Sequence, residues 1–74
     1  MGDSIKISYD SQVDAAYFAI KQSGPGEVVK TYTCDIEEVG GIINLDFDKG
    51  GRLVGIEILD ATALLPPNFI FSAS

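Results

Sequence analysis

Histidine is absent from this 74-residue chain, and cysteine occurs once, at Cys34. Structural zinc sites are built mainly from histidine and cysteine, so the sequence does not provide such a site. A single cysteine also excludes an intrachain disulfide, and no histidine is available to activate its thiol as a nucleophile. The simplest interpretation of Cys34 is a small apolar strand residue in a reducing cytosol.

Positive charge and long apolar runs are also scarce. Five Lys and Arg against eleven Asp and Glu give a formal charge of −6, which repels nucleic-acid phosphates and anionic lipid headgroups but suits a basic protein partner. No segment approaches the ~18–20 apolar residues that a membrane helix needs, and no basic-then-apolar secretory signal opens the chain. We therefore expect a cytoplasmic protein that binds neither nucleic acid nor membrane.

Apolar residues at helical spacing are rare before the carboxyl end, and an alternation with a period of two dominates instead. This alternation predicts five strands, over 4–9, 14–20, 27–36, 41–48 and 52–59. The expected fold is mainly β, bordering on α+β: a five-stranded antiparallel up-and-down sheet with a hairpin at each end of the order. Segment 14–21 also fits one face of a helix, but its short length and flanking turn signals favour a strand.

The chain is long enough for one domain, and its carboxyl end differs in character from the strands. We expect residues 1–3 to be disordered and Asp60 to cap a short helix over 60–65, which Pro66 and Pro67 end. The tail 68–74 is too apolar to be freely solvated, so it should dock on the sheet.

Alternation collects large apolar side chains on one face of the predicted sheet. Five strands at ~4.8 Å spacing and about seven residues long present roughly 500 Å² in plan, of which a six-residue helix covers about a fifth. We therefore expect a homodimer that packs through this face. The alternative is that the tail folds back and closes the core alone. The expected interface residues are Ile43, Leu45, Phe47, Val54, Ile56, Ile58, Phe69 and Phe71.

Polar side chains gather on the opposite face, where Asn44, Asp46 and Glu57 lie on adjacent strands. Two carboxylates held close could act as acid and base or bind a hard cation. Asp46, Asp48 and Glu57 also match positions one, three and twelve of a calcium loop. Position five is Gly50 instead of Asp or Asn, however, and the flanking segments are strands instead of helices. We therefore expect a solvated polar face and no metal or cofactor.

A second polar cluster lies near the first predicted turn and contains Tyr9, Asp10, Asp14 and Tyr17. Aspartate side chains commonly accept hydrogen bonds from backbone amides in turns, so turn capping is the expected role of Asp10 and Asp14.

Three parts of the chain are similar to a known family. They are Tyr-Asp at 9–10 leading to Asp-Ala-Ala-Tyr-Phe at 14–18, Gly-Ile-Ile-Asn-Leu-Asp-Phe-Asp at 41–48, and Gly-Arg-Leu-Val-Gly-Ile-Glu-Ile-Leu-Asp-Ala at 51–61. The family that they resemble consists of small prokaryotic proteins and is called domain of unknown function 2283. The resemblance implies a compact strand-rich domain with no established activity, so no functional residues can be carried over. Members are sometimes encoded beside small toxin-like proteins, which implies an antitoxin-type or other partner-binding role. Lys49 and Gly50 replace the more acidic residues expected before Gly51, which weakens a shared cation site.

Two functions fit these patterns. The first is a protein-binding module that dimerises through its sheet and engages a basic partner through its acidic surface. The second is a small cation-dependent or acid/base enzyme that uses Asn44, Asp46 and Glu57. The sequence has no phosphate loop, nucleophile elbow or metal-spaced His/Cys set, so the binding module is favoured.

Overall fold

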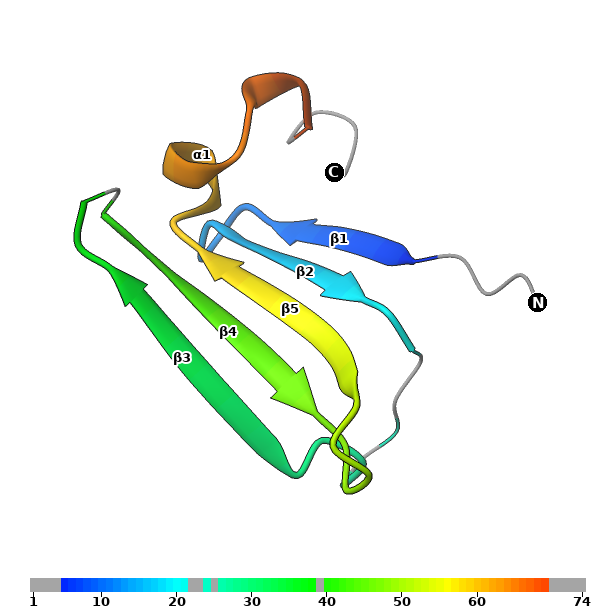
Figure 1. Cartoon of the computed structure of the whole chain (residues 1–74). Coiled ribbons are helices and arrows are strands. Elements are labelled where there is room, and N and C mark those ends of the chain that lie inside the picture. The colour runs from blue at the N-terminus through cyan, green and yellow to red at the C-terminus, as the bar shows by residue number, and fades with distance from the viewer. Residues whose placement is uncertain (1–4, 22–23, 25, 39, 70–74) are drawn as a thin grey trace.

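Five strands form one antiparallel sheet, and a short helix follows the last strand (Figure 1). This computed structural model describes residues 5–21, 24, 26–38 and 40–69. The elements are β1 Lys6–Asp10, β2 Ala15–Ala19, β3 Lys30–Ile36, β4 Gly41–Phe47, β5 Leu53–Leu59 and α1 Ala61–Leu64. The mainly β fold is confirmed, and segment 14–21 contains a strand. The expected disorder of residues 1–3 lies outside the described residues.

The strand order is β1-β2-β5-β4-β3, and every neighbouring pair is antiparallel. The predicted up-and-down arrangement, in which the strands follow one another in sequence order, is therefore wrong. Strands β2 to β5 form a Greek key, because the last strand inserts beside β2 instead of at an edge. The reason is the composition of β5. Its run Leu-Val-Gly-Ile-Glu-Ile-Leu is among the most apolar in the sheet. A central position gives this run a neighbouring strand on both sides.

Helix α1 is capped by Asp14 and not by Asp60, which corrects the expected role of both aspartates. Asp60 has a left-handed backbone (φ 58°), and its side chain makes no capping hydrogen bond. The Asp14 carboxylate accepts hydrogen bonds from the backbone N–H of Thr62 (3.1 Å) and from its hydroxyl (2.8 Å). The Tyr9 hydroxyl also donates to Asp14 (2.8 Å), and this bond and those from Thr62 hold the pKa of Asp14 below its usual value. The first hairpin therefore supplies the cap that the short helix lacks.

Asp10 acts as expected, because its carboxylate accepts a hydrogen bond from the backbone N–H of Gln12 (3.0 Å) in the turn between β1 and β2. The turn then ends at Asp14, whose φ of 54° lies in the left-handed region. The tight turn places the carbonyl of Asp14 within 2.9 Å of the backbone N of Ala61. The start of α1 is thus held by both the backbone and the side chain of one residue.

The buried core is small and lies between the sheet and α1. It consists of Ala16, Ile58 and Ala61, with Leu64 and Leu65 of the helical segment packed against it. A side chain at position 41 would collide with Leu64, so Gly41 lets the helix approach β4 closely. None of the described helices has the length and apolar character of a membrane-spanning helix.

The first part of the apolar tail docks on the sheet. The helix ends before Pro66 and Pro67, as expected, and residues 67–69 form a further helical turn. This turn brings the ring of Phe69 against that of Phe18 on β2, with centroids 5.4 Å apart and planes at 20°. Docking is therefore confirmed for Phe69, whereas residues 70–74, including Phe71, lie outside the described residues.

Candidate functional site

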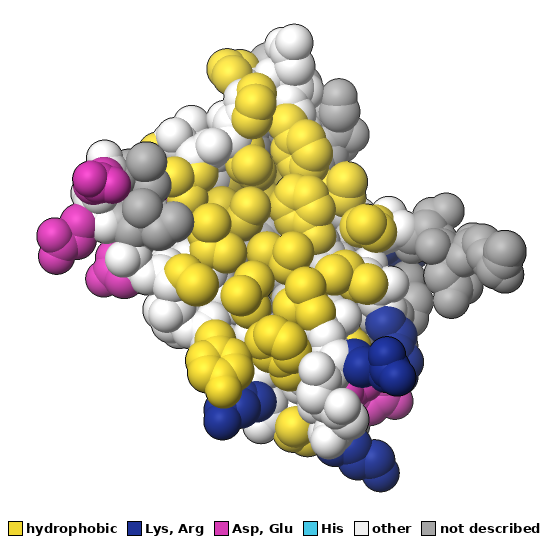
Figure 2. All heavy atoms as spheres, in the orientation of Figure 1, with side chains coloured by type: hydrophobic (Ala, Val, Ile, Leu, Met, Phe, Trp, Pro, Cys, Tyr) yellow, Lys and Arg dark blue, Asp and Glu magenta, His cyan; other side chains and the backbone are white. Residues whose placement is uncertain are grey.

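The face of the sheet that carries α1 is a continuous apolar surface (Figure 2). The strand registers align two adjacent rows of side chains across all five strands. One row contains Ile7, Phe18, Ile56, Leu45 and Tyr32. The next row contains Tyr9, Ala16, Ile58, Ile43 and Cys34. We call this surface the apolar face.

The described part of the chain covers only one end of the apolar face. Buried hydrophobic residues are limited to Ala16, Val54, Ile58 and Ala61, and no large side chain is fully buried among the described residues. At the other end, Tyr32 keeps 52% of its surface exposed, and its ring meets that of Phe47 edge-on at 5.7 Å. Helix α1 and Phe69 therefore shield the part of the face near the turn of the first hairpin and leave Ile7 on β1 and Tyr32 on β3 exposed.

The residues expected at the interface come together on this face as far as they are described. Val54 and Ile58 are buried, and Ile43, Leu45, Phe47, Ile56 and Phe69 are half-buried. A β-bulge interrupts the register between Asp46 and Phe47 and adds an extra residue to β5 there. The expected position of Phe71 lies outside the described residues.

The opposite, polar face carries two separate hydrogen-bond networks. The side-chain amide of Asn44 donates to Glu57 (3.0 Å) and accepts from the hydroxyl of Thr33 (2.8 Å). Asp46 belongs to the other network, where it accepts from the hydroxyls of Tyr17 (2.9 Å) and Thr31 (2.8 Å). The structure therefore joins Asn44 to Glu57 but gives Asp46 different partners. These ladders stabilise neighbouring strands across the sheet.

Tyr17 lies on the polar face but not in the expected cluster with Tyr9, Asp10 and Asp14, because its hydroxyl bonds to Asp46 while Tyr9 alone of that cluster bonds to Asp14. Its ring crosses β5 over Gly55, where any side chain would collide with the phenol, and its hydroxyl reaches Asp46 on β4. Burial, followed by the bond to Asp46, raises the pKa of Tyr17 to about 12. The available signal was Gly55 itself, because a glycine inside a strand often marks a close approach.

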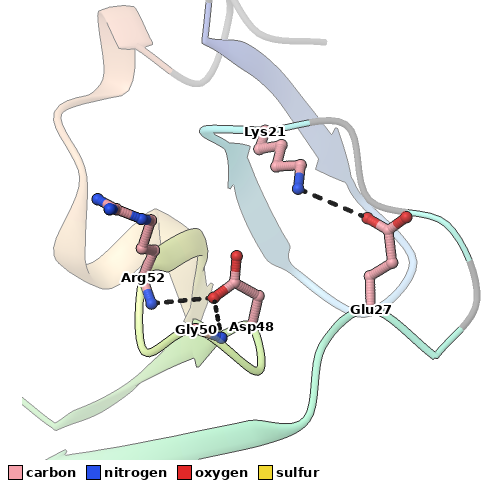
Figure 3. Close-up of polar contacts among 5 residues, drawn as sticks. All are labelled: Lys21, Glu27, Asp48, Gly50 and Arg52. Atoms are coloured by element: carbon pink, nitrogen blue, oxygen red, sulfur yellow. Dashed lines mark hydrogen bonds and ion pairs between the residues drawn. The ribbon is translucent and has the colours of Figure 1, made fainter.

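Asp48 stabilises the hairpin between β4 and β5 (Figure 3). One carboxylate oxygen accepts from the backbone N–H of Gly50 (2.9 Å) and of Arg52 (3.0 Å), and Gly51 adopts a φ of 80°. The backbone hydrogen bond from Arg52, and to a lesser extent that from Gly50, holds the pKa of Asp48 below its usual value. The acidic residue here therefore serves the turn.

The three residues weighed as cation ligands, Asp46, Asp48 and Glu57, thus lie in three different settings. Across residues 5–21, 24, 26–38 and 40–69, the structure forms no group of three His, Cys, Asp or Glu that could hold a metal ion. A hollow of about 310 Å³ near the hairpin is lined by Lys21, Gly26, Glu27, Val29, Asp48 and Lys49. Its two basic and two acidic side chains give it no preference for a ligand of either sign.

The family described as "Protein of unknown function (DUF2283)" matches residues 6–61, from the start of β1 to the start of α1. The chain belongs to this family. The DUF2283 region therefore contains the whole Greek key sheet and Asp14, while Phe69 lies beyond it. Comparisons with curated proteins and with solved structures gave no match.

Proposed function

We propose that this DUF2283 domain is a cytoplasmic protein-binding module that works as a homodimer, in which two copies pack through their apolar faces. The supporting observation is the half-buried state of Leu45, Phe47 and Ile56, together with the absence of any fully buried large side chain among the described residues. Apolar surfaces of several hundred Å² are uncommon on monomers and usually mark an interaction site.

The size of the face agrees with a dimer. Helix α1 covers about a fifth of the roughly 500 Å² in plan per copy, so a face-to-face pair removes on the order of 800 Å² from water, which lies at the low end of interface sizes. Two sheets of this kind stack ~10 Å apart with their side chains interleaved. The aromatic pair Tyr32 and Phe47 would then be enclosed by the second copy, and aromatic residues are enriched in such interfaces.

The mass of the protein in solution tests this proposal. Light scattering coupled to gel filtration at micromolar concentration should give twice the 7.9 kDa of one chain. The reason is that an uncovered apolar face costs free energy in water until a second copy covers it. A mass of one chain at that concentration would contradict the dimer.

Dimerisation through the apolar face leaves both polar faces pointing outward, and these would bind a basic protein, in the manner of an antitoxin. The chain carries a net charge of −6, and Asp46 and Glu57 lie on the polar face. Their hydrogen-bond networks hold both carboxylates in defined positions before a partner arrives.

Capture of a partner from the native host tests the second half of the proposal. The wild-type protein should retain a basic protein, and the variant carrying Asp46→Lys and Glu57→Lys should lose it, because the charges then repel. A Lys49→Glu variant, changed in the hairpin at 48–52, serves as the control and should retain the same protein. Equal recovery by wild type and double variant would contradict a role for the polar face.

A further inference from the structure

Apart from Glu57, which lies in the middle row of the sheet, the described charged side chains are divided between its two ends. The strand registers place all five Lys and Arg at the end that carries the hairpin between β4 and β5, together with three acidic residues. The basic residues are Lys6, Lys21, Lys30, Lys49 and Arg52, and the acidic ones are Glu27, Asp46 and Asp48. We call this the basic end.

The opposite end carries acidic residues alone among those described. They are Asp10, Asp14, Asp35, Glu37, Glu38 and Asp60. We call it the acidic end. Figure 2 shows a group of acidic side chains at the left margin of the apolar face, and basic side chains mainly along the lower and right margins, where some acidic surface lies among them. The protein is therefore an electric dipole directed along its strands.

Symmetry limits how two apolar faces can meet. In a closed dimer, a two-fold axis that brings the same face of both copies together must lie in the plane between them. Aligned sheets leave two main choices, an axis along the strands or an axis across them. An axis along the strands stacks acidic end on acidic end, whereas an axis across them stacks each acidic end on a basic end.

We propose that the second copy packs on the apolar face about an axis across the strands, so that the acidic end of each copy covers the basic end of the other. This inference rests on the proposed dimer and adds its orientation. Like charges brought together at an interface disfavour an arrangement, and complementary ones select it. With a net charge of −6 on each copy, the stacking of two acidic ends would be the most repulsive arrangement.

This orientation places β3 of one copy over β3 of the other. Lys30 begins β3 on the apolar face, where its ammonium lies 5.1 Å from the centre of the Tyr32 ring. Glu37 and Glu38 follow the other end of β3 and are exposed. Rotation about an axis across the strands therefore brings Lys30 of each copy opposite Glu37 and Glu38 of the other, and the contact occurs twice.

Charge reversal tests this contact. At low ionic strength, Lys30→Glu should weaken dimerisation roughly tenfold, as should the combined Glu37→Lys and Glu38→Lys, because each change acts at two symmetric contacts. A variant that carries all three substitutions should dimerise again, because the acidic and basic side chains have then changed places and still attract each other. Lys6→Glu is the matched control: it reverses a charge at the same end but on the polar face, so the dissociation constant should change less than about twofold.

Cys34 provides an independent readout, because it lies near the middle of β3 on the apolar face. With β3 over β3, the two thiols are separated mainly by the ~10 Å between stacked sheets. An axis along the strands would instead place them at opposite edges, four strand spacings or ~19 Å apart before that separation is added. A bis-maleimide with a reach of about 10 Å should therefore join two wild-type chains.

The outcomes separate the two proposals. A wild-type protein that is monomeric would overturn the dimer and this orientation together. A wild-type dimer that resists the cross-linker, or that responds to Lys30→Glu no more than to Lys6→Glu, would overturn the orientation alone. Cross-linking in the dimer, with loss of affinity on charge reversal and recovery on charge exchange, supports it.

Discussion

Leu45→Lys should convert the protein from a dimer to a monomer. Leu45 lies on β4 in the row that also holds Ile56 and Tyr32, so its side chain is central in the proposed interface. Enclosing an unpaired ammonium between two apolar faces costs several kcal/mol, and each ~1.4 kcal/mol weakens association tenfold. We expect dimerisation to weaken by at least about a hundredfold, measured by sedimentation at a series of concentrations.

The matched control is Asn44→Lys, which places the same side chain one residue earlier on the same strand but on the polar face. There the ammonium lies beside Glu57 and remains in water, so the protein should stay dimeric. Circular dichroism of both variants should keep the β-sheet signal, because the strand ladders lie within one chain and the lysine introduced on the apolar face can extend into solvent in the monomer. Equal dissociation constants for Leu45→Lys and wild type would place the interface elsewhere.

Gly55→Val should destabilise the fold by about 2 kcal/mol, although valine is intrinsically the better strand residue. The new side chain would occupy the space of the Tyr17 phenol, so the ring must move and release Asp46. The lost hydrogen bond contributes about 1 kcal/mol, and overpacking adds about the same. Thermal unfolding should show a melting temperature lower by roughly 10 °C for a domain of this size.

A second background isolates the cause of this effect. In a Tyr17→Ala protein the space above Gly55 is empty, so Gly55→Val should become neutral or stabilising there. The same loss of stability in both backgrounds would show that the backbone of β5, and not the phenol, requires glycine. A Tyr17→Phe variant separates the hydrogen bond from the packing, because it keeps the ring and removes only the donor.

The local elements were largely predictable, because period-two alternation is a property of neighbouring residues. It located five strands to within about three residues and placed Ile43, Leu45 and Ile56 on one face. The second hairpin followed from its glycine-bearing loop. The prolines correctly marked the end of the helical segment, because neither can donate a backbone hydrogen bond.

The candidate cation cluster was less predictable, because alternation assigns a face but not a partner. Asn44, Asp46 and Glu57 do share the polar face, as expected. Which of them meet depends on the register between β4 and β5 and on competing donors from β2 and β3. Tyr17 and Thr31 donate hydrogen bonds to Asp46. Of the three candidate residues, therefore, only Asn44 and Glu57 contact each other. Pairing across strands is a long-range choice that no local pattern encodes.

The sequence by itself determined that this is a one-sided, strand-rich, acidic domain, because alternation, turn residues and charge all act over a few positions. Only the tertiary structure decided the Greek key order, the capping of α1 by Asp14 from 48 positions away and the bond between Tyr17 and Asp46, 29 positions apart. These contacts form when distant segments pack, and the apolar run of β5 gains most by taking the centre of the sheet. The same packing placed the basic side chains at one end of the sheet and most of the acidic ones at the other.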